Sequence, residues 1–451
     1  MKKKRIFAAA LAGLMLASLF AGCSSNNTGG GDTGNDSSGD TINLRYWGYS
    51  RWKGLTGTEE NGEFGDWEKK VAEDYMKEHS NVKIEYENLP WNGGPEKVEV
   101  AIASKTQPDV LEDGTLRGFG YAGQGVLLTF DDELTEEERA DIIDTEWDQV
   151  EYTDGTHIAM PWANMSSFML INKTLFEKAG AVDLLPTEGD RSWTFDEFEK
   201  ALAAVSKDGV YGMALVAGNE QGDAKGMNLM RGFGASILSP DGSKATLNTP
   251  EGVKALTWMA SLIDKGYAMP GAETITAPDV IDYFSQQKVA IIDGVGTGNL
   301  AEFEQRMERG DSEKFDITWA LTPNDGTHEG GFNANPVCVM AFKSGDEARE
   351  KAAIDFTKFV TSGENAKAVQ YAKLMPTRKS ASDLYEGDEI MTWSSEIMKY
   401  GVDPGFISPA YSKIRAVLYP ELQALYTKAK TPEQVAADFD TAAQAEIDKS
   451  K

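Results

Sequence analysis

The chain has 451 residues, a formal net charge of −28 at pH 7 and two cysteines. The charge falls by four units, to −32, if the basic residues at positions 2–5 are removed. This acidity argues against nucleic acid as a partner and against a basic membrane-binding face, because both need clustered Lys and Arg. Two cysteines cannot form a disulfide framework, so the folded part must be stabilised by its own core.

The first residues predict export. Positions 2–5 are basic, positions 6–20 are apolar, and Ala21 and Gly22 precede Cys23. This order is typical of a secretory signal, and the apolar run is too short for a good membrane-spanning helix. Residues 24–40 are almost all Ser, Asn, Gly, Thr and Asp, a composition that predicts a flexible tether.

Cys23 has a further significance. The segment Phe20-Ala21-Gly22-Cys23 resembles a bacterial lipobox, with Phe20 where that motif usually has Leu. The resemblance implies that Cys23 is acylated, and that it anchors an exported protein to the outer face of the cell membrane.

Strands and helices alternate after the tether. Period-two alternation predicts strands over 42–47 and 82–86. A helix over about 64–75 lies between them, so the three form a βαβ unit whose strands run parallel. A helix over 96–104 and a short strand over 108–111 follow.

The alternation continues to the end of the chain. Further strands are predicted over 167–172, 289–292 and 337–342. Further helices are predicted over 175–179, from a capping box at Thr194–Glu197, from Pro250, and over 346–360, 363–373 and 413–449. Gly294 to Gly298 is interpreted as a loop, because no capped helix or acidic partner of a nucleotide site is evident after it. The pattern, without internal repeats, predicts an α/β protein of two lobes.

Seven local motifs occur in the order found in family 1 extracellular sugar-binding proteins of ABC transporters. Each alone is a cap, a turn or a strand edge, and only their order is specific. The segments that resemble the family's motifs are 105–110 (KTQPDV), 154–162 (DGTHIAMPW), 171–180 (INKTLFEKAG), 192–198 (SWTFDEF), 248–253 (NTPEGV), 284–290 (FSQQKVA) and 375–380 (MPTRKS).

The resemblance implies a two-lobed periplasmic-binding-protein fold of the maltose-binding-protein type, with crossing hinge strands and the ligand between the lobes. It implies crossings near 166–169, near 333–337 and near Pro404. The expected divisions are 1–22 signal peptide, 23–40 lipidated Cys and tether, 41–167 first lobe, 168–335 second lobe, 336–403 first lobe again and 404–451 C-terminal helices of the second lobe. One departure concerns the family's frequent GGPW segment: the chain has Asp293 to Gly298 there, without an aromatic residue.

A sugar site needs aromatic rings to stack on C–H faces and polar side chains to bind hydroxyl groups. In α/β lobes such groups belong on loops at the carboxyl ends of strands. The family resemblance further implies that the hinge lines the cleft floor. Tyr411 and Arg415 are included because the family's C-terminal helix commonly presents an aromatic residue and an Arg to the cleft. The candidate binding residues are Trp47, Tyr49, Trp52, Glu87, Asn88, Trp91, Asp113, Trp162, Asn164, Phe332, Asn333, Tyr411 and Arg415. Arg117, which follows the same strand as Asp113, and Asn335, which lies at the same crossing as Asn333, are considered with them.

Each candidate has a structural alternative. Trp47, Tyr49 and Trp52 could instead pack against a neighbouring loop, and Arg415 could form a structural ion pair. Glu87, Asn88 and Trp91 could be exposed without contacting a ligand.

The function expected from the resemblance is sugar capture for an ABC importer, by a monomer that needs no cofactor or metal. A secreted carbohydrate-active enzyme is the main alternative, since the many Asp and Glu could include a catalytic pair. No Ser-His-Asp motif, HExxH or P-loop supports an enzyme. Two further alternatives remain: a protein of the same fold that binds a non-sugar solute, and a surface adhesin.

Overall fold

The computed structural model describes residues 41–49, 51–91, 93–219, 221–328, 330–402 and 407–450. The predicted signal peptide, Cys23, the tether over 23–40 and the crossing near Pro404 lie outside these residues.

Strands and helices alternate through the described residues. The strands are β1 (Ile42–Gly48), β2 (Val82–Asn88), β3 (Val110–Gly114), β4 (Met160–Asn164), β5 (Phe168–Asn172), β6 (Tyr211–Met213), β7 (Val289–Val295), β8 (Ile317–Ala320), β9 (Phe332–Asn333), β10 (Val337–Ala341), β11 (Met375–Pro376) and β12 (Gly401–Val402). The α-helices are α1 (Asp66–Glu78), α2 (Gly94–Ala103), α3 (Thr115–Gly123), α4 (Glu136–Asp141), α5 (Asp144–Asp148), α6 (Lys173–Ala179), α7 (Phe195–Val205), α8 (Gly222–Arg231), α9 (Pro250–Asp264), α10 (Ala277–Ser285), α11 (Thr297–Arg309), α12 (Glu347–Val360), α13 (Gly363–Ala366), α14 (Glu389–Ile397), α15 (Tyr411–Tyr426) and α16 (Pro432–Lys449).

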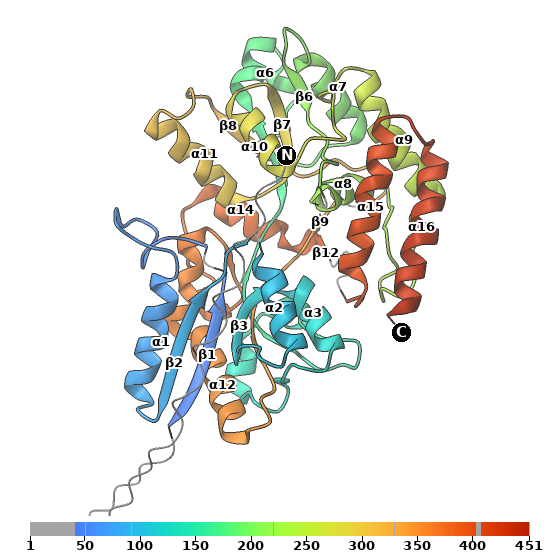
Figure 1. Ribbon diagram of the computed structural model, residues 1–451. Helices are drawn as coiled ribbons and strands as arrows, with labels where there is room; N and C mark the ends of the chain where they lie inside the picture. The colour runs from blue at the N-terminus through green and yellow to red at the C-terminus, as the bar shows by residue number, and fades with distance from the viewer. Residues whose placement is uncertain are drawn as a thin grey trace, which may run out of the picture. The chain divides into compact units, whose positions relative to one another are not determined.

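The first lobe is built on a six-stranded sheet in the order β11-β4-β10-β3-β1-β2. Strands β1 and β2 pair in parallel, as the βαβ pattern predicts, because α1 provides the crossover between them. Strand β10 pairs antiparallel with β3 and β4. The ring of Tyr75 on α1 lies 5.1 Å from that of Phe356 on α12, so the two helices share one core beside the sheet (Figure 1).

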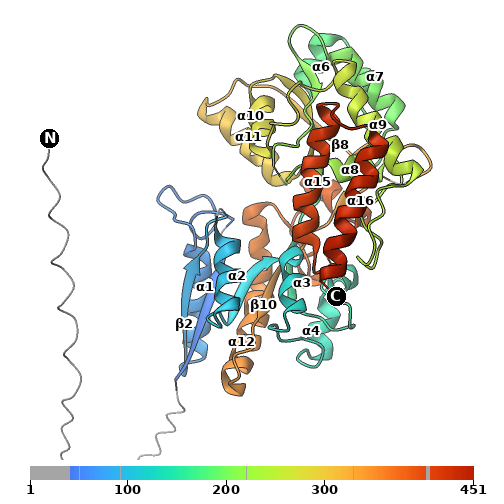
Figure 2. The ribbon, with the colours of Figure 1, turned by 45° about the vertical axis from the view of Figure 1, so that its right-hand side comes forward.

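The second lobe is built on a four-stranded sheet in the order β6-β7-β5-β8. Helix α7 begins at the predicted capping box: Thr194 Oγ1 accepts from the Glu197 amide, and the Glu197 carboxylate accepts from the Thr194 amide. Helices α15 and α16, near the end of the chain, pack beside α8 and α9 (Figure 2). The C-terminal residues therefore complete the second lobe.

The chain passes between the sheets more than once. It leaves the first sheet after β4 and enters the second at β5, so residues 165–167 form a crossing. It returns to the first sheet at β10 through residues 334–336, after β9, which pairs in parallel with β12 in a separate two-stranded sheet. These segments place the hinge between the two sheets.

Helix α14 packs with the second lobe, although residues 336–403 are expected in the first. The Trp393 ring lies 5.1 Å from Phe168 on β5, and the Tyr400 hydroxyl donates to Asp190 at 2.9 Å. Trp393 is 6% exposed. Because burial of this indole beside β5 is favourable, the chain passes from the first lobe to the second before Glu389. No turn motif in the sequence marks this passage.

Two expected elements differ in the structure. The prediction of a loop over Gly294 to Gly298 is wrong, because β7 continues to Val295 and α11 begins at Thr297. Its cap is unusual: the Asn299 side chain accepts from the Gly296 amide at 3.2 Å, which satisfies a free helix-end donor. The expected helix over 363–373 stops at Ala366 and continues as a 3₁₀ turn over Lys367–Ala372.

Candidate functional site

A cavity of about 320 Å³ lies between the lobes. Its first-lobe wall is formed by Leu116 at the start of α3, Asn335 before β10 and Leu374 before β11. The crossing segment adds Met165 and its two neighbours, Ser166 and Ser167. The second lobe supplies the rest of the lining from α8, the β7–α11 turn, β9 and α15.

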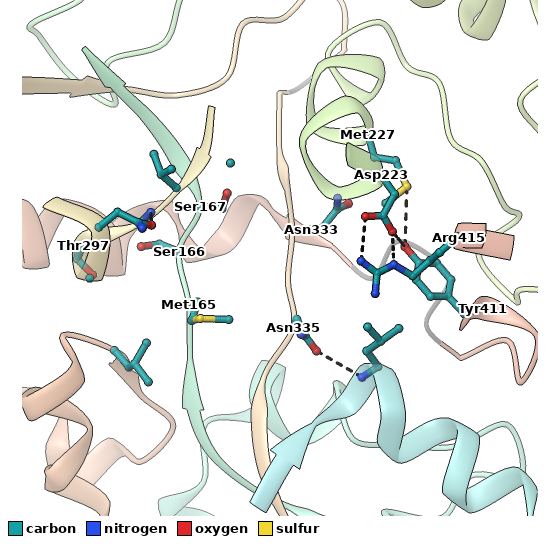
Figure 3. A pocket seen from close by; sticks show the side chains of 17 residues that line it. Met165, Ser166, Ser167, Asp223, Met227, Thr297, Asn333, Asn335, Tyr411 and Arg415 are labelled. Atoms are coloured by element: carbon teal, nitrogen blue, oxygen red, sulfur yellow. Dashed lines mark hydrogen bonds and ion pairs between the residues drawn. The ribbon is translucent and has the colours of Figure 1, made fainter. Parts of the chain in front are cut away.

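A buried ion pair forms the second-lobe wall. Arg415 on α15 donates to both carboxylate oxygens of Asp223 on α8, from Nε at 2.6 Å and from Nη2 at 3.2 Å. The Tyr411 hydroxyl is 3.5 Å from the same carboxylate (Figure 3). The Asp223 side chain is 2% exposed and the Arg415 side chain 19%, so the charge-assisted hydrogen bonds of the pair are largely shielded from water on the carboxylate side.

A glycine-rich turn forms the opposite part of the lining. Gly294 has φ +66°, and a Cβ on Gly296 would lie 2.8 Å from the Ser166 carbonyl oxygen. Glycine is therefore required for the crossing segment to approach this closely. The Lys225 ammonium, buried behind the turn, donates to the carbonyl oxygens of Asp293 at 2.7 Å and Gly294 at 3.3 Å.

Burial shifts the pKa of both charged groups behind this turn. Desolvation lowers the pKa of Lys225 to about 8, partly opposed by Asp293. Desolvation raises the pKa of Asp293 to about 6, opposed by the Thr322 hydroxyl, which donates to it at 2.8 Å, and by Lys225. The turn is thus held from behind by the half-buried Lys225 and the buried Asp293.

Contacts across the cavity connect the two lobes. The Thr297 hydroxyl at the start of α11 donates to the Lys373 carbonyl of the first lobe at 2.5 Å. Asn335 Oδ1 accepts from the Leu116 amide at 3.3 Å and so fixes one side of the return crossing. The hydroxyl of Ser166 is buried and has no hydrogen-bond partner among the described residues. A bound hydroxyl group would satisfy it.

Three of the predicted binding residues line this cavity: Asn333, Tyr411 and Arg415. Asn333 also accepts from Arg231 at 3.1 Å, and its amide donates to Asn228 at 3.2 Å. The accompanying Asn335 lines the cavity as well. The C-terminal helix and the return crossing are therefore where the structure brings predicted residues together.

The aromatic candidates of the first lobe pack among themselves. Tyr49 is buried and stacks on Trp91 at 4.6 Å, and Trp91 is 55% exposed. Trp52 packs between Trp67 at 5.4 Å and Trp162 at 6.2 Å. The Trp162 indole donates to the Asn365 carbonyl at 3.2 Å. None of these five rings lines the inter-lobe cavity.

The remaining candidates have other partners. Trp47 is buried beneath the Lys97 ammonium, 4.6 Å from its ring, and Lys97 also pairs with Glu87. Asp113 at the end of β3 pairs with Arg117 on α3, four residues later. The other three are placed as follows: Asn88 ends β2 opposite Gly48, Asn164 donates to Glu146 at 2.8 Å, and Phe332 is buried in the second lobe.

Sequence reasoning missed Asp223, Met227, Met165 and Thr297. No strand end or motif marks the first two, since α8 begins well after β6. The glycines at 294–298 could have indicated that Thr297 lies at the site. They stand where the family often has its GGPW segment, and a segment in that position lies at the same edge of the lobe whatever its residues. Within the described ranges, no group of three or more His, Cys, Asp and Glu is placed to hold a metal ion. No described helix has both the length and the apolar character needed to span a membrane.

Comparison with known proteins agrees with this architecture. Residues 70–396 match the family described as bacterial extracellular solute-binding protein. A binding protein of Brucella abortus is 23% identical over 399 residues, which cover 88% of this chain and 93% of the relative.

Two solved structures share the fold. The GacH receptor of Streptomyces glaucescens, studied unliganded and with acarbose, has a TM-score of 0.72 at 18% identity, covering 91% of this chain and 100% of the receptor. The cyclic α-maltosyl-1,6-maltose binding protein of Arthrobacter globiformis has a TM-score of 0.73 at 19% identity, with the same coverages. The two-lobed fold and the match over 70–396 together show that this chain belongs to the bacterial extracellular solute-binding protein family.

Proposed function

We propose that this protein captures a sugar in the cavity between its lobes and delivers it to an ABC permease. The observation that carries the proposal is the lining of the cavity. It combines the Asp223–Arg415 pair, amide side chains and serine hydroxyls with the apolar surfaces of Met165, Leu374 and Tyr411. Such a mixture of paired donors, acceptors and apolar surface suits a molecule with hydroxyl groups around a carbon ring.

Binding and release are proposed to follow from hinge motion. The ligand would contact both lobes and the crossing at once, so it favours the closed arrangement over the open one. One two-lobed receptor of related fold is described in complex with acarbose, and another is named as a cyclic α-maltosyl-1,6-maltose binding protein. These names support a carbohydrate ligand here. Lipidation of Cys23 and the tether over 23–40 would hold the receptor at the outer face of the membrane beside its permease.

A carbohydrate-active enzyme is less well supported. Glycoside hydrolysis uses two carboxylates, separated by roughly 5–9 Å, on either side of the bond to be cleaved. Among the described residues that line the cavity, Asp223 is the one carboxylate, and it is engaged by Arg415. We therefore propose binding without turnover.

The test is a thermal-shift screen of the chain from Ser24 onward against mono- and oligosaccharides, with recovery of each sugar afterwards. A ligand that binds the native state alone stabilises it by about 2.7 kcal/mol at a hundredfold excess over its dissociation constant. We expect one sugar class to raise the midpoint and to be recovered unchanged. Consumption of the sugar would support the enzyme, and shifts by peptides or other solutes alone would refute the carbohydrate assignment.

A further inference from the structure

A second cavity, of about 570 Å³, adjoins the inter-lobe cavity. The two share four lining residues: Gly294, Val295, Asn299 and Arg415. The described lining of the second cavity comes entirely from the second lobe, from the start of α8, α10, the β7–α11 turn, α11 and α15. Each cavity lies within the roughly 300–1,000 Å³ range of small-molecule sites.

The guanidinium groups that line the second cavity are already paired with carboxylates. Arg306 on α11 pairs with Asp282 at 2.9 Å and with Glu302 at 2.7 Å. Arg415 is held by Asp223, and the Lys225 ammonium donates to two backbone carbonyl oxygens. An anionic ligand would have to compete with these carboxylates for their guanidinium groups, and a cationic ligand would have to displace an arginine.

An uncharged polyhydroxyl ligand avoids both costs. A hydroxyl group both donates and accepts, so it can bind beside a guanidinium–carboxylate pair without separating the two charges. Gln221 and Asn299 add neutral amide groups to the same lining. The apolar side of the cavity is provided by Ala277, Pro278 and Ile281 along α10.

We propose that the second cavity holds the outer rings of an uncharged oligosaccharide whose inner part lies between the lobes. This inference rests on the proposed sugar-binding function and specifies the ligand class and where its far end lies. Arg415 lines both cavities and so contacts the ligand at the junction. Because the second cavity belongs to one lobe, the outer rings remain bound to that lobe whether the hinge is open or closed.

The experiment is a calorimetric titration with one neutral sugar at increasing chain length, from one to five units, on the chain from Ser24 onward. The readout is the ratio of affinities between the longest and shortest ligands that bind. In the wild type we expect this ratio to exceed about tenfold, a difference that titration resolves readily. Ala277→Phe, which fills the second cavity, should reduce the ratio towards one.

The matched control is Ala203→Phe, on an exposed face of α7 in the same lobe, which should keep the wild-type ratio. Glu302→Ala is a second, smaller change. It removes from the cavity the carboxylate that pairs with Arg306, and it should also lower the ratio of affinities. A ratio near one in the wild type would overturn the second cavity while leaving the proposed function standing. Tighter binding of an acidic oligosaccharide than of a neutral one of equal length would overturn the uncharged ligand. Absence of binding by every sugar would overturn both proposals.

Discussion

The two lobes use their polar and aromatic side chains in opposite ways. At the carboxyl edge of the first sheet, Tyr49, Trp52 and Trp162 are buried against other rings, and Glu112 pairs with Arg51 beside them. In the second lobe, Asp223, Tyr411 and Arg415 are held together at the wall of the cavity. Aromatic residues in a cleft loop thus indicate a packed lobe as readily as a ligand platform. In this chain paired polar groups of the second lobe line the cavity, whereas the aromatic rings of the first lobe pack on one another.

The largest effect on ligand affinity is expected at the second-lobe wall, from a change at Asp223. Asp223→Ala removes the carboxylate that accepts two hydrogen bonds from Arg415. Losing these charge-assisted hydrogen bonds to the partly exposed Arg415 should cost about 2–3 kcal/mol of unfolding free energy, and ligand affinity should fall at least about a hundredfold. Urea unfolding and calorimetric titration measure the two effects. Asp223→Asn, which preserves the shape, should recover part of the stability, and wild-type affinity in Asp223→Ala would show that the pair is not at the site.

The matching change in the first lobe should separate stability from binding. Trp162 is fully buried, stacks on Trp67 at 5.2 Å and does not line the cavity. Trp162→Ala leaves a large void and should cost about 3–5 kcal/mol. At a temperature where the variant is folded, its affinity should lie near that of the wild type. A large loss of affinity in the milder Trp162→Phe, with stability preserved, would assign Trp162 to the binding site.

The stability of the folded protein is expected to depend on pH through Glu146, which contacts Asn164 just before the crossing segment. Burial raises the pKa of Glu146 to about 7, although Asn164 donates to it at 2.8 Å. The folded protein then binds more protons than the unfolded chain between about pH 4.5 and 7, so this group lowers stability as pH rises through that window. Glu146→Gln retains an acceptor for Asn164 and should be more stable above pH 8, by up to about 3 kcal/mol.

Urea unfolding at pH 4.5 and pH 8 measures this difference. The variant and the wild type should be nearly equal in stability at pH 4.5 and should diverge towards pH 8. Equal stabilities across the whole range would mean that Glu146 is ionised without cost in the folded protein.

The smallest expected effect concerns the contact between the lobes. Thr297→Ala removes the hydrogen bond to the Lys373 carbonyl, a contribution of about 1 kcal/mol. If this bond belongs to the liganded arrangement, affinity should fall by about fivefold. Thr297→Ser keeps the hydroxyl and should behave like the wild type. Equal losses in both variants would attribute the effect to the threonine methyl group.

Local features of the fold were predictable from sequence. The capping box at Thr194 and Glu197 marks the start of α7, and alternation over 42–47 and 82–86 predicts the parallel pair β1–β2. These signals work because caps and strand periods depend on neighbours in sequence. The helix after Gly296 escaped prediction because its cap is a backbone amide bound by Asn299, not a Ser, Thr or Asp side chain.

The site was less predictable, because it depends on partners that are distant in sequence. Asp223 and Arg415 are 192 positions apart, and nothing local to Asp223 indicates their contact. Tyr411 and Arg415 were predicted through family resemblance and not from their own pattern. Trp52 and Trp162 show the opposite limitation: their chemistry suits a sugar, but whether a ring faces a cleft or another ring is decided by packing.

The central claim is that the solute is held between the lobes against the second-lobe wall. The most direct measurement is a crystal structure of the chain from Ser24 onward with the tightest-binding sugar from the screen. The account predicts density for the sugar in the inter-lobe cavity, within hydrogen-bond distance of Asp223 and Arg415 and beside the ring of Tyr411. A sugar bound instead at the exposed face of Trp91, with the inter-lobe cavity empty, would contradict it.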